Sequence, residues 1–172
     1  ILDLKYLFIE TNSKVYFNTN LAPSAAFVST VVQRNLTTYA ESSQLNKYGA
    51  RLKYSKLLKV IDESHESITS NITTVEMRRD LRLAVNQPAE YAIDFGNQFH
   101  IKSMSGYNIR SSAFRVINIS SDVYLFDTPD IDGKRGQIGL FSLPEGSSTP
   151  IIQRRNIGII NYETGRITLD PI

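Results

Sequence analysis

The chain contains no cysteine and no tryptophan, and no apolar run approaches the roughly 20 residues that a membrane-spanning helix needs. Without cysteine, disulfides, thiol nucleophiles and thiolate metal sites are excluded together. An excess of one charge is also lacking, because 19 basic and 17 acidic residues leave a net charge of +2. That is too little to indicate a polyanionic partner, since phosphate binding needs clustered positive charge. The remaining composition, 41% hydrophobic and 21% charged over 172 residues, is typical of one globular domain or two small ones.

The first residues alternate in polarity like a strand. The sequence begins at Ile1 with neither Met nor a signal-like segment, so we expect a fragment of a longer protein. The pattern of residues 2–9 has the two-residue period of a strand, and residues 14–18 read as a second one. Thr11-Asn12-Ser13 between them carries turn chemistry. We therefore predict a hairpin at the start of the chain.

Two amphipathic helices are predicted next. The first opens at Ala22-Pro23-Ser24 and fades over residues 42–46, and the second has an apolar stripe at i, i+3, i+4 and i+7 from Tyr54. Residues 68–83, rich in Ile, Thr and Val, then predict a long strand. The sequence thus predicts a two-helix/small-sheet sandwich over residues 1–85. The residues expected to be buried by the helices are Val31, Leu36, Leu57 and Ile61.

Three lysines mark the second helix. Lys53, Lys56 and Lys59 fall three apart, on the side away from Leu57 and Ile61. A lysine face opposite an apolar face is usually solvated. No aromatic platform accompanies these lysines and acidic residues follow closely, which is unlike a nucleic-acid site. The pattern favours a helix that braces a sheet.

From residue 86 the helical period disappears. Short alternating segments separated by Asp132-Gly133, residues 144–148 and Glu163-Thr164-Gly165 indicate a β-rich antiparallel sub-domain over residues 86–172. The predicted fold class is therefore α+β. The strands expected in this sub-domain cover residues 91–95, 112–119, 123–126, 137–143, 151–154 and 157–162.

The residues that could carry chemistry do not form a recognisable catalytic or metal motif. His65 and His100 each lack a second ligand at metal spacing. Asp130, Asp132 and Gly133 partly fit a calcium loop, but the bidentate Glu is missing, so a turn is the better prediction. Gly133-Lys134-Arg135-Gly136 lacks the strand-loop-helix setting of a phosphate loop and reads as a hairpin tip. We expect no enzymatic activity, cofactor or metal.

The succession of motifs between residues 47 and 82 resembles that of the baseplate J-like family of contractile-tail phages, and within it the C-terminal part of the large wedge proteins of T-even phages. The motifs are a glycine before a (K/R)-Y-S-K-L helix start, an Ile-containing helix and a Ser-Ile strand. The stretch NIGIINYETGRITLD at residues 156–170 is also similar to terminal hairpins of such proteins. The matching positions are Gly49, Tyr54, Ser55, Leu57, Leu58, Ile61, Ser67, Ile68 and Thr69.

The resemblance implies a structural virion protein of a contractile-tail baseplate wedge. Such proteins pair with themselves and with other wedge components in a ring that rearranges on contraction. They are assembled in the host cytoplasm, and no nucleic acid, membrane or small-molecule partner is expected. The alternative is a sheet-based binding module for nucleic acid or carbohydrate, with aromatic side chains as stacking platforms. Its candidate residues are Tyr6, Phe8, Tyr16 and Phe17.

For self-association the most suggestive segment is the predicted hairpin from Ile157 to Leu169, which offers an Ile-rich edge beside a turn. Exposed edges pair readily with other chains, so we expect a homodimer through this hairpin. Because alternation places the isoleucines on both faces, they could equally fill the local core. The candidate interface residues are Ile157, Ile159, Ile160 and Tyr162.

Overall fold

A computed structural model describes residues 7–47, 49–82 and 89–171. The chain divides into two compact units: residues 9–78, here called the helical unit, and residues 1–8 with 79–172, here called the sheet unit. The sub-domain boundary predicted between residues 85 and 86 falls outside the described residues. Within the described part of the chain, neither helix has the length and apolarity needed to cross a membrane.

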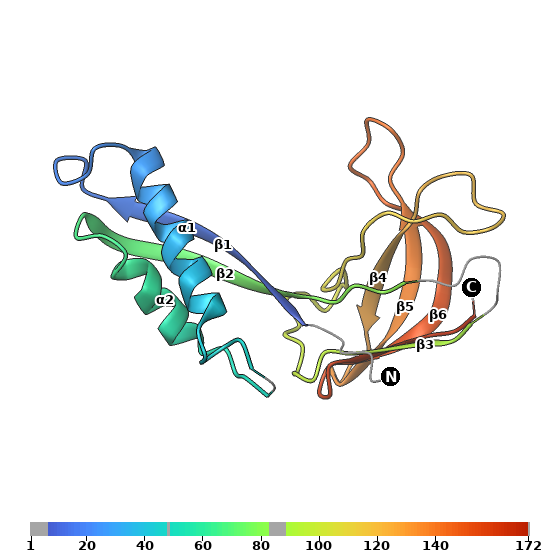
Figure 1. Cartoon of the computed structure of the whole chain (residues 1–172). Coiled ribbons are helices and arrows are strands. Elements are labelled where there is room, and N and C mark those ends of the chain that lie inside the picture. Colours follow the sequence, from blue (N-terminus) through green and yellow to red (C-terminus); the bar gives the residue numbers. More distant parts are fainter. Residues whose placement is uncertain (1–6, 48, 83–88, 172) are drawn as a thin grey trace. The chain divides into compact units, whose positions relative to one another are not determined.

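The helical unit combines a two-stranded antiparallel sheet with two helices (Figure 1). Its elements, in chain order, are β1 (Phe8–Phe17), α1 (Ala25–Glu41), α2 (Tyr54–Asp62) and β2 (Ile68–Arg78). The side-chain hydroxyls of Thr69 and Thr74 in β2 donate hydrogen bonds to main-chain carbonyls of β1, at Tyr16 and Asn12. The predicted α/β sandwich of two helices on a small sheet is therefore present.

The hairpin predicted within residues 2–18 is wrong. β1 continues through Asn12 and Ser13 without a turn. The Ser13 hydroxyl lies 2.9 Å from the hydroxyl of Thr73, a residue 60 positions further along the chain. This cross-strand contact gives the Ser13 hydroxyl a hydrogen-bond partner while its backbone stays extended. Local turn propensity contains no information about such a distant partner.

The two helices bury one apolar stripe each. The Ser24 hydroxyl caps α1 by accepting a hydrogen bond from the Phe27 N–H. Val28 and Val32 of α1 then meet Ile61 of α2 in a core that is closed by strand residues. Of the four residues predicted to be buried, Leu57 and Ile61 are 4% and 0% exposed, whereas Val31 and Leu36 are only partly buried.

Polar bonds fix α2 to β2. The Tyr54 hydroxyl donates to the carbonyl of Thr73 over 2.6 Å, and the side-chain amide of Asn71 donates to Asp62 Oδ1 over 2.7 Å. One bond lies at each end of α2, so the helix is held against the strand along its whole length. This arrangement agrees with the bracing role predicted from the lysine pattern.

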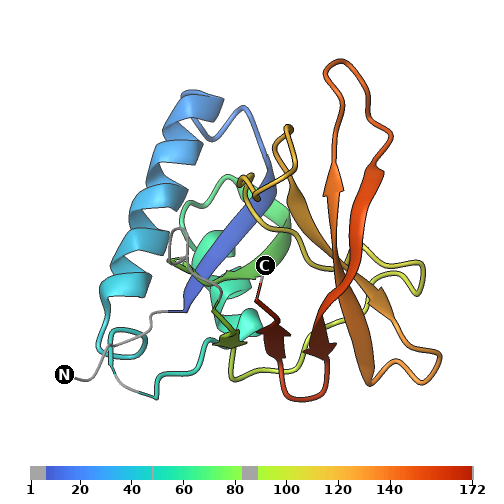
Figure 2. The same ribbon diagram turned by 90° about the vertical axis from the view of Figure 1, so that its right-hand side faces the viewer.

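The sheet unit contains a five-stranded antiparallel sheet in the order β3-β7-β6-β5-β4 (Figure 2). One face of the sheet is covered by the irregular segment 95–123, whose apolar side chains pack on Ile138, Ile160 and Ile167. The core of the unit therefore lies between sheet and coil. The strands are β3 (Tyr91–Asp94), β4 (Tyr124–Pro129), β5 (Arg135–Ser142), β6 (Ile151–Asn161) and β7 (Arg166–Leu169).

Two strand predictions in this unit need correction. Residues 112–119 form no strand, only an isolated bridge between Phe114 and Val123, and a turn follows in which Asn118 has a positive φ of 69°. The two strands predicted at 151–154 and 157–162 are one strand, β6. Its register with β5 shifts between Ile138 and Leu140, as at a β-bulge. Asn156, which has a positive φ, lies in β6 at this shift.

Candidate functional site

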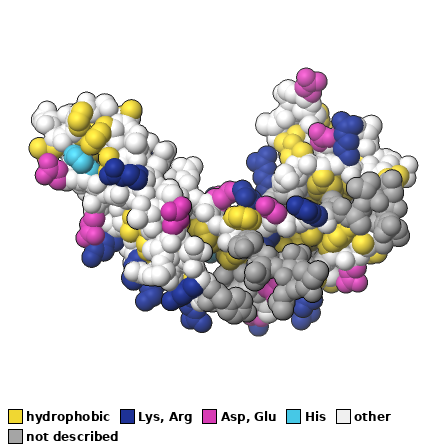
Figure 3. Space-filling view, viewed as in Figure 1, with side chains coloured by type: hydrophobic (Ala, Val, Ile, Leu, Met, Phe, Trp, Pro, Cys, Tyr) yellow, Lys and Arg dark blue, Asp and Glu magenta, His cyan; other side chains and the backbone are white. Residues whose placement is uncertain are grey.

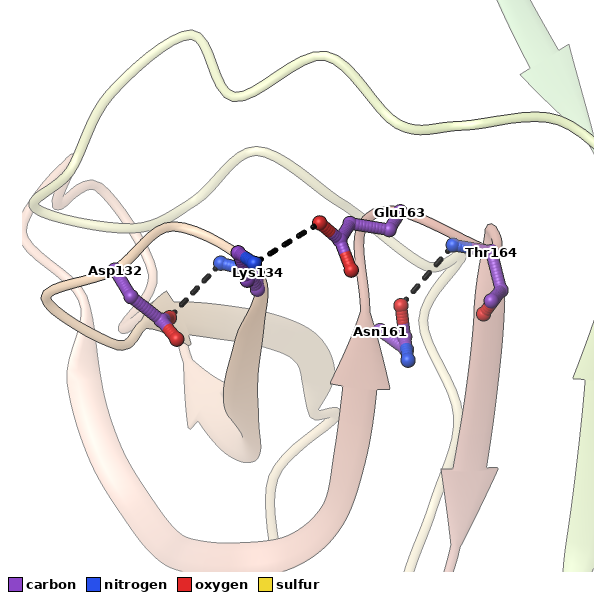
Figure 4. A network of polar contacts seen from close by, with 5 residues as sticks. All are labelled: Asp132, Lys134, Asn161, Glu163 and Thr164. Carbon is purple, nitrogen blue, oxygen red and sulfur yellow. Dashed lines mark hydrogen bonds and ion pairs between the residues drawn. The ribbon is translucent and has the colours of Figure 1, made fainter.

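Two turns meet at one end of the sheet (Figure 4). Lys134, immediately before β5, forms an ion pair with Glu163 in the β6–β7 turn, with 3.6 Å between Nζ and Oε1. Its main-chain N–H bonds Asp132, and its carbonyl accepts from the Tyr162 N–H. The Asn161 side chain accepts from the Thr164 N–H within the second turn. This is the hairpin tip predicted from the Gly-Lys-Arg-Gly sequence.

Asp127 is the buried polar centre of the sheet unit, with no exposed surface. Its Oδ1 accepts from the Ile109 N–H at 2.9 Å, and its Oδ2 accepts from Asn108 Nδ2 at 2.7 Å and the Tyr162 hydroxyl at 2.6 Å. Asn108 in turn accepts from the N–H groups of Lys102 and Ser103. One carboxylate therefore fastens the covering segment to the sheet.

Tyr162 is held protonated by this site. Burial, and then the hydrogen bond to Asp127, raise the pKa of Tyr162 far above its ordinary value of 10.0. The folded chain thus retains a proton that the unfolded chain releases at high pH. Its contribution to stability is fully present below about pH 10 and is lost above it, by about 1.4 kcal/mol per pH unit.

We predict that Tyr162→Phe lowers the free energy of unfolding by about 1.5–3 kcal/mol near neutral pH, because a hydrogen bond to a charged group is lost. The deficit relative to the unmodified chain should shrink by about 1 kcal/mol between about pH 10 and about pH 11. Urea unfolding of both proteins at each pH measures it, and the difference cancels the titration of the other tyrosines. A deficit that stays constant with pH contradicts the assigned pKa shift.

The aspartates that partly fit a calcium loop are separated. Asp127 is buried in β4, whereas Asp130 and Asp132 are exposed in the β4–β5 turn. The Asp132 carboxylate accepts the Lys134 N–H, and the Asp130 carbonyl accepts the Gly133 N–H. The predicted turn is present. Among the described residues no group of three or more acidic, His or Cys side chains could hold a metal ion.

The two histidines are also apart. His65 Nδ1 accepts from the Ser67 N–H at 3.1 Å and lies 2.8 Å from the Ser67 hydroxyl, while its ring meets the edge of Phe27. It therefore orders the turn between α2 and β2. His100 is exposed in the segment that covers the larger sheet. The Ser67 residue beside His65 has no exposed surface, so this pair is closed to solvent on the serine side.

The four candidate interface residues do not share a surface. Ile157, Ile160 and Tyr162 are 8%, 0% and 1% exposed and belong to the core, whereas Ile159 is 52% exposed. Residues Gly158 to Asn161 of β6 pair with both β5 and β7, so this part of the hairpin is not an edge, and that prediction is corrected. The core reading holds for three residues, and only Ile159 remains available to a partner.

Ile159 lies in the central strand on the uncovered face of the larger sheet. Its direct neighbours across the strands are Gln137 and Thr168, and the same row continues to Thr128 and Ala92 at the two outer strands. No member of this row, here called the Ile159 row, carries a charge. The lack of charge in this row, with an exposed isoleucine at its centre, is one feature that it shares with interface cores.

An aromatic cluster adjoins the row on this face. Phe126 lies two residues from Thr128 on β4, and Tyr107 stacks on its ring with centroids 5.1 Å apart. Tyr107 is 47% exposed and has a positive φ of 62°, unusual for a residue with a bulky side chain. Gly139 makes room for the Phe126 ring, because a Cβ there would lie 2.5 Å from it. Sequence analysis missed Tyr107, which sits in a segment without periodicity, and Gly106-Tyr107 offered only a turn signal.

The three lysines predicted on one face of the second helix have different surroundings. Lys59 forms an exposed ion pair with Glu63. Lys53 and Lys56 line a shallow cleft of about 340 Å³ beside the start of α2, together with Lys47 and Arg51. Figure 3 shows Lys and Arg side chains gathered along the lower side of the helical unit. Tyr39 also lines this basic cleft.

The aromatic residues of the alternative binding module are not a common platform. Phe17 packs against the core of the helical unit, and Tyr6 lies outside the described residues. Tyr16 is 42% exposed, with the Lys14 ammonium 5.2 Å from its ring centre. Phe8 is 39% exposed. Stacking of successive bases or sugars needs neighbouring open rings. The positions of Phe8, Tyr16 and Phe17 therefore give no support to the alternative of a sheet-based binding module.

The described residues define a class of protein: a small α+β unit and a unit built on a five-stranded antiparallel sheet, in which the buried Asp127 links segments of the chain to one another. Residues 5–80, which span the helical unit, match the family model described as baseplate structural protein gp6, C-terminal domain III. This match confirms the resemblance to gp6-like baseplate proteins and supports a structural role in a phage baseplate. No curated protein matches the chain.

Proposed function

We propose that the chain is a structural component of a contractile phage tail baseplate wedge, located in the virion and assembled in the host cytoplasm. The observation that carries this proposal is the gp6 domain match over the whole helical unit. The polar centre at Asp127 and Tyr162 is consistent with it, because every bond made there ties one segment of the chain to another. The chain acts by contact, not by turnover.

The expected partners are a second copy of the chain and other wedge proteins. A ring that rearranges on contraction needs moderate interfaces with a polar rim, which can slide or separate. The face of the Ile159 row fits this need. Beside the uncharged row lie Arg135, Arg166 and Asp94, which are exposed and lie on the same face in the next row. A two-fold pair through this face can place basic and acidic groups of opposite copies at its rim.

Co-assembly tests the proposed function directly. The chain, mixed with the other purified wedge proteins of the same phage, should enter a complex that sediments faster than any component. Its role in rearrangement is tested by comparing chemical cross-links in particles before and after contraction. A chain that never joins the wedge proteins overturns the assembly role.

We predict that Ile159→Lys weakens self-association at least about tenfold, since a charge at the centre of an interface is left desolvated and unpaired. Light scattering or sedimentation velocity over a range of concentrations measures it. The matched control is Ile131→Lys, the same substitution at a turn residue that is fully exposed. Truncation at Asn156 is less informative, because it also removes the core residues Ile160 and Leu169. Equal association by both variants, or a chain that is monomeric throughout, contradicts a dimer through this face.

A further inference from the structure

A cleft lies between α1 and β1. It holds about 350 Å³ and is lined by one stripe of the helix and one face of the strand. β2 is the only strand that pairs with β1 in the described part of the chain, so the other edge of β1 is open. Figure 2 shows α1 running beside β1 in this region. The lining residues are Thr11, Ser13, Val15, Phe17, Ala25, Val28, Ser29, Val32, Gln33 and Leu36.

The free main-chain groups of β1 belong to the same residues that line the cleft. The Asn18 N–H bonds the Ser67 carbonyl, and the carbonyls of Tyr16 and Asn12 accept from threonines of β2. In an antiparallel pair both main-chain groups of a residue point to the same side, and successive residues alternate. Since the even-numbered residues face β2, the odd-numbered ones face the open edge. These are the strand residues that line the cleft, Thr11, Ser13, Val15 and Phe17.

The chemistry of the cleft restricts what can fill it. None of its lining residues is charged, so it offers nothing to an acidic or basic ligand. A helix or a lipid chain would cover the free N–H and C=O groups of β1 without bonding them, and burying unpaired main-chain groups is costly. An extended polypeptide supplies matching groups at the same spacing. Its alternate side chains would meet Val28 and Val32 beneath α1.

We propose that the open edge of β1 accepts an extended, uncharged strand from another baseplate protein, which inserts under α1 and becomes the third strand of the sheet. The inference rests on the proposed assembly role and names how the helical unit binds its partner. A second copy of the chain fits less well. Antiparallel pairing of two β1 strands about a two-fold axis puts both copies of α1 on the same face of the joined sheet, where each obstructs the other.

Hydrogen exchange tests the inserted strand. The ¹⁵N-labelled chain is assembled with the other purified wedge proteins, exchanged in D₂O, dissociated and analysed by NMR. The amides of Thr11, Ser13, Val15 and Phe17 should exchange at least about tenfold more slowly in the complex than in the free chain. The neighbouring amides of Asn12, Lys14 and Tyr16, which face β2 by the same alternation, should be slow in both.

A pair of matched variants separates the cleft from the rest of α1. Ser29→Lys places a charge in the cleft, and the slowing of the odd-numbered amides should be lost. Thr30→Lys adds the same charge to the next, exposed residue outside the cleft and should leave the slowing intact. Both positions are exposed, so neither substitution removes core packing.

The remaining outcomes each overturn the inference. If the chain joins the complex while the odd-numbered amides exchange as fast as before, the inserted strand is excluded and the assembly role stands. If the chain does not join the complex, both the inserted strand and the assembly role are excluded. If these amides slow in the free chain as its concentration rises, β1 pairs with a second copy instead of a partner protein.

Discussion

Asp127→Ala is expected to lower the free energy of unfolding of the sheet unit by at least about 3 kcal/mol. The carboxylate has no exposed surface and accepts three hydrogen bonds, from Ile109, Asn108 and Tyr162. Its removal leaves three buried donors without their acceptor, and each buried donor left unpaired costs about 1–3 kcal/mol. Because Asn108 also holds the segment at Lys102 and Ser103, we expect the covering segment to loosen from the sheet.

Urea unfolding monitored by circular dichroism gives the change in stability, and hydrogen exchange shows whether residues 102–109 lose protection first. The matched control is Asp132→Ala, which removes an exposed carboxylate from the β4–β5 turn with a single bond to the Lys134 N–H. That change should cost less than about 1 kcal/mol. Similar losses for both aspartates would show that Asp127 does not hold the covering segment.

Leu57→Ala is expected to destabilise the helical unit by about 2–5 kcal/mol. Leu57 is 4% exposed and lies on the face of α2 that also carries Ile61, one turn further along. Truncation removes buried apolar surface and leaves a cavity that a unit of this size can close only partly. The helical unit has only two helices and two strands among its described residues, so its total free energy of unfolding is small. The expected loss is therefore a large part of that free energy.

Denaturant unfolding of the full chain measures this loss, followed by the protection of amides in α1 and α2. Leu21→Ala is the control, because Leu21 belongs to the same unit and is 52% exposed. We expect less than about 1 kcal/mol for it. A loss below about 1 kcal/mol for Leu57→Ala as well would mean that the inward face of α2 is wrongly assigned.

Much of the candidate contact surface could not be predicted from the sequence. Ile159 and Ile160 are adjacent and chemically identical, yet one is 52% exposed and the other is completely buried. Alternation guarantees that two neighbours in a strand face opposite ways, but not which face is covered. That depends on the segment 95–123, most of whose apolar side chains pack on the face of Ile160 and which has no periodicity of its own.

The sequence by itself determined the helices, the turns of the sheet unit at Gly133 and Gly165, and the α+β class, because these depend on neighbours within a few residues. The stripe from Tyr54 to Ile61 located α2, and Gly133 and Gly165, both at positive φ, marked turns that the structure contains. Only the tertiary structure decided that β1 runs straight through Asn12 and Ser13 and that Asp127 is buried. Both outcomes rest on partners far along the chain: Thr73 for Ser13, and Tyr162 for Asp127. A local pattern contains no information on such partners, since the energy of a cross-strand or buried polar bond exists only once strand order and register are set.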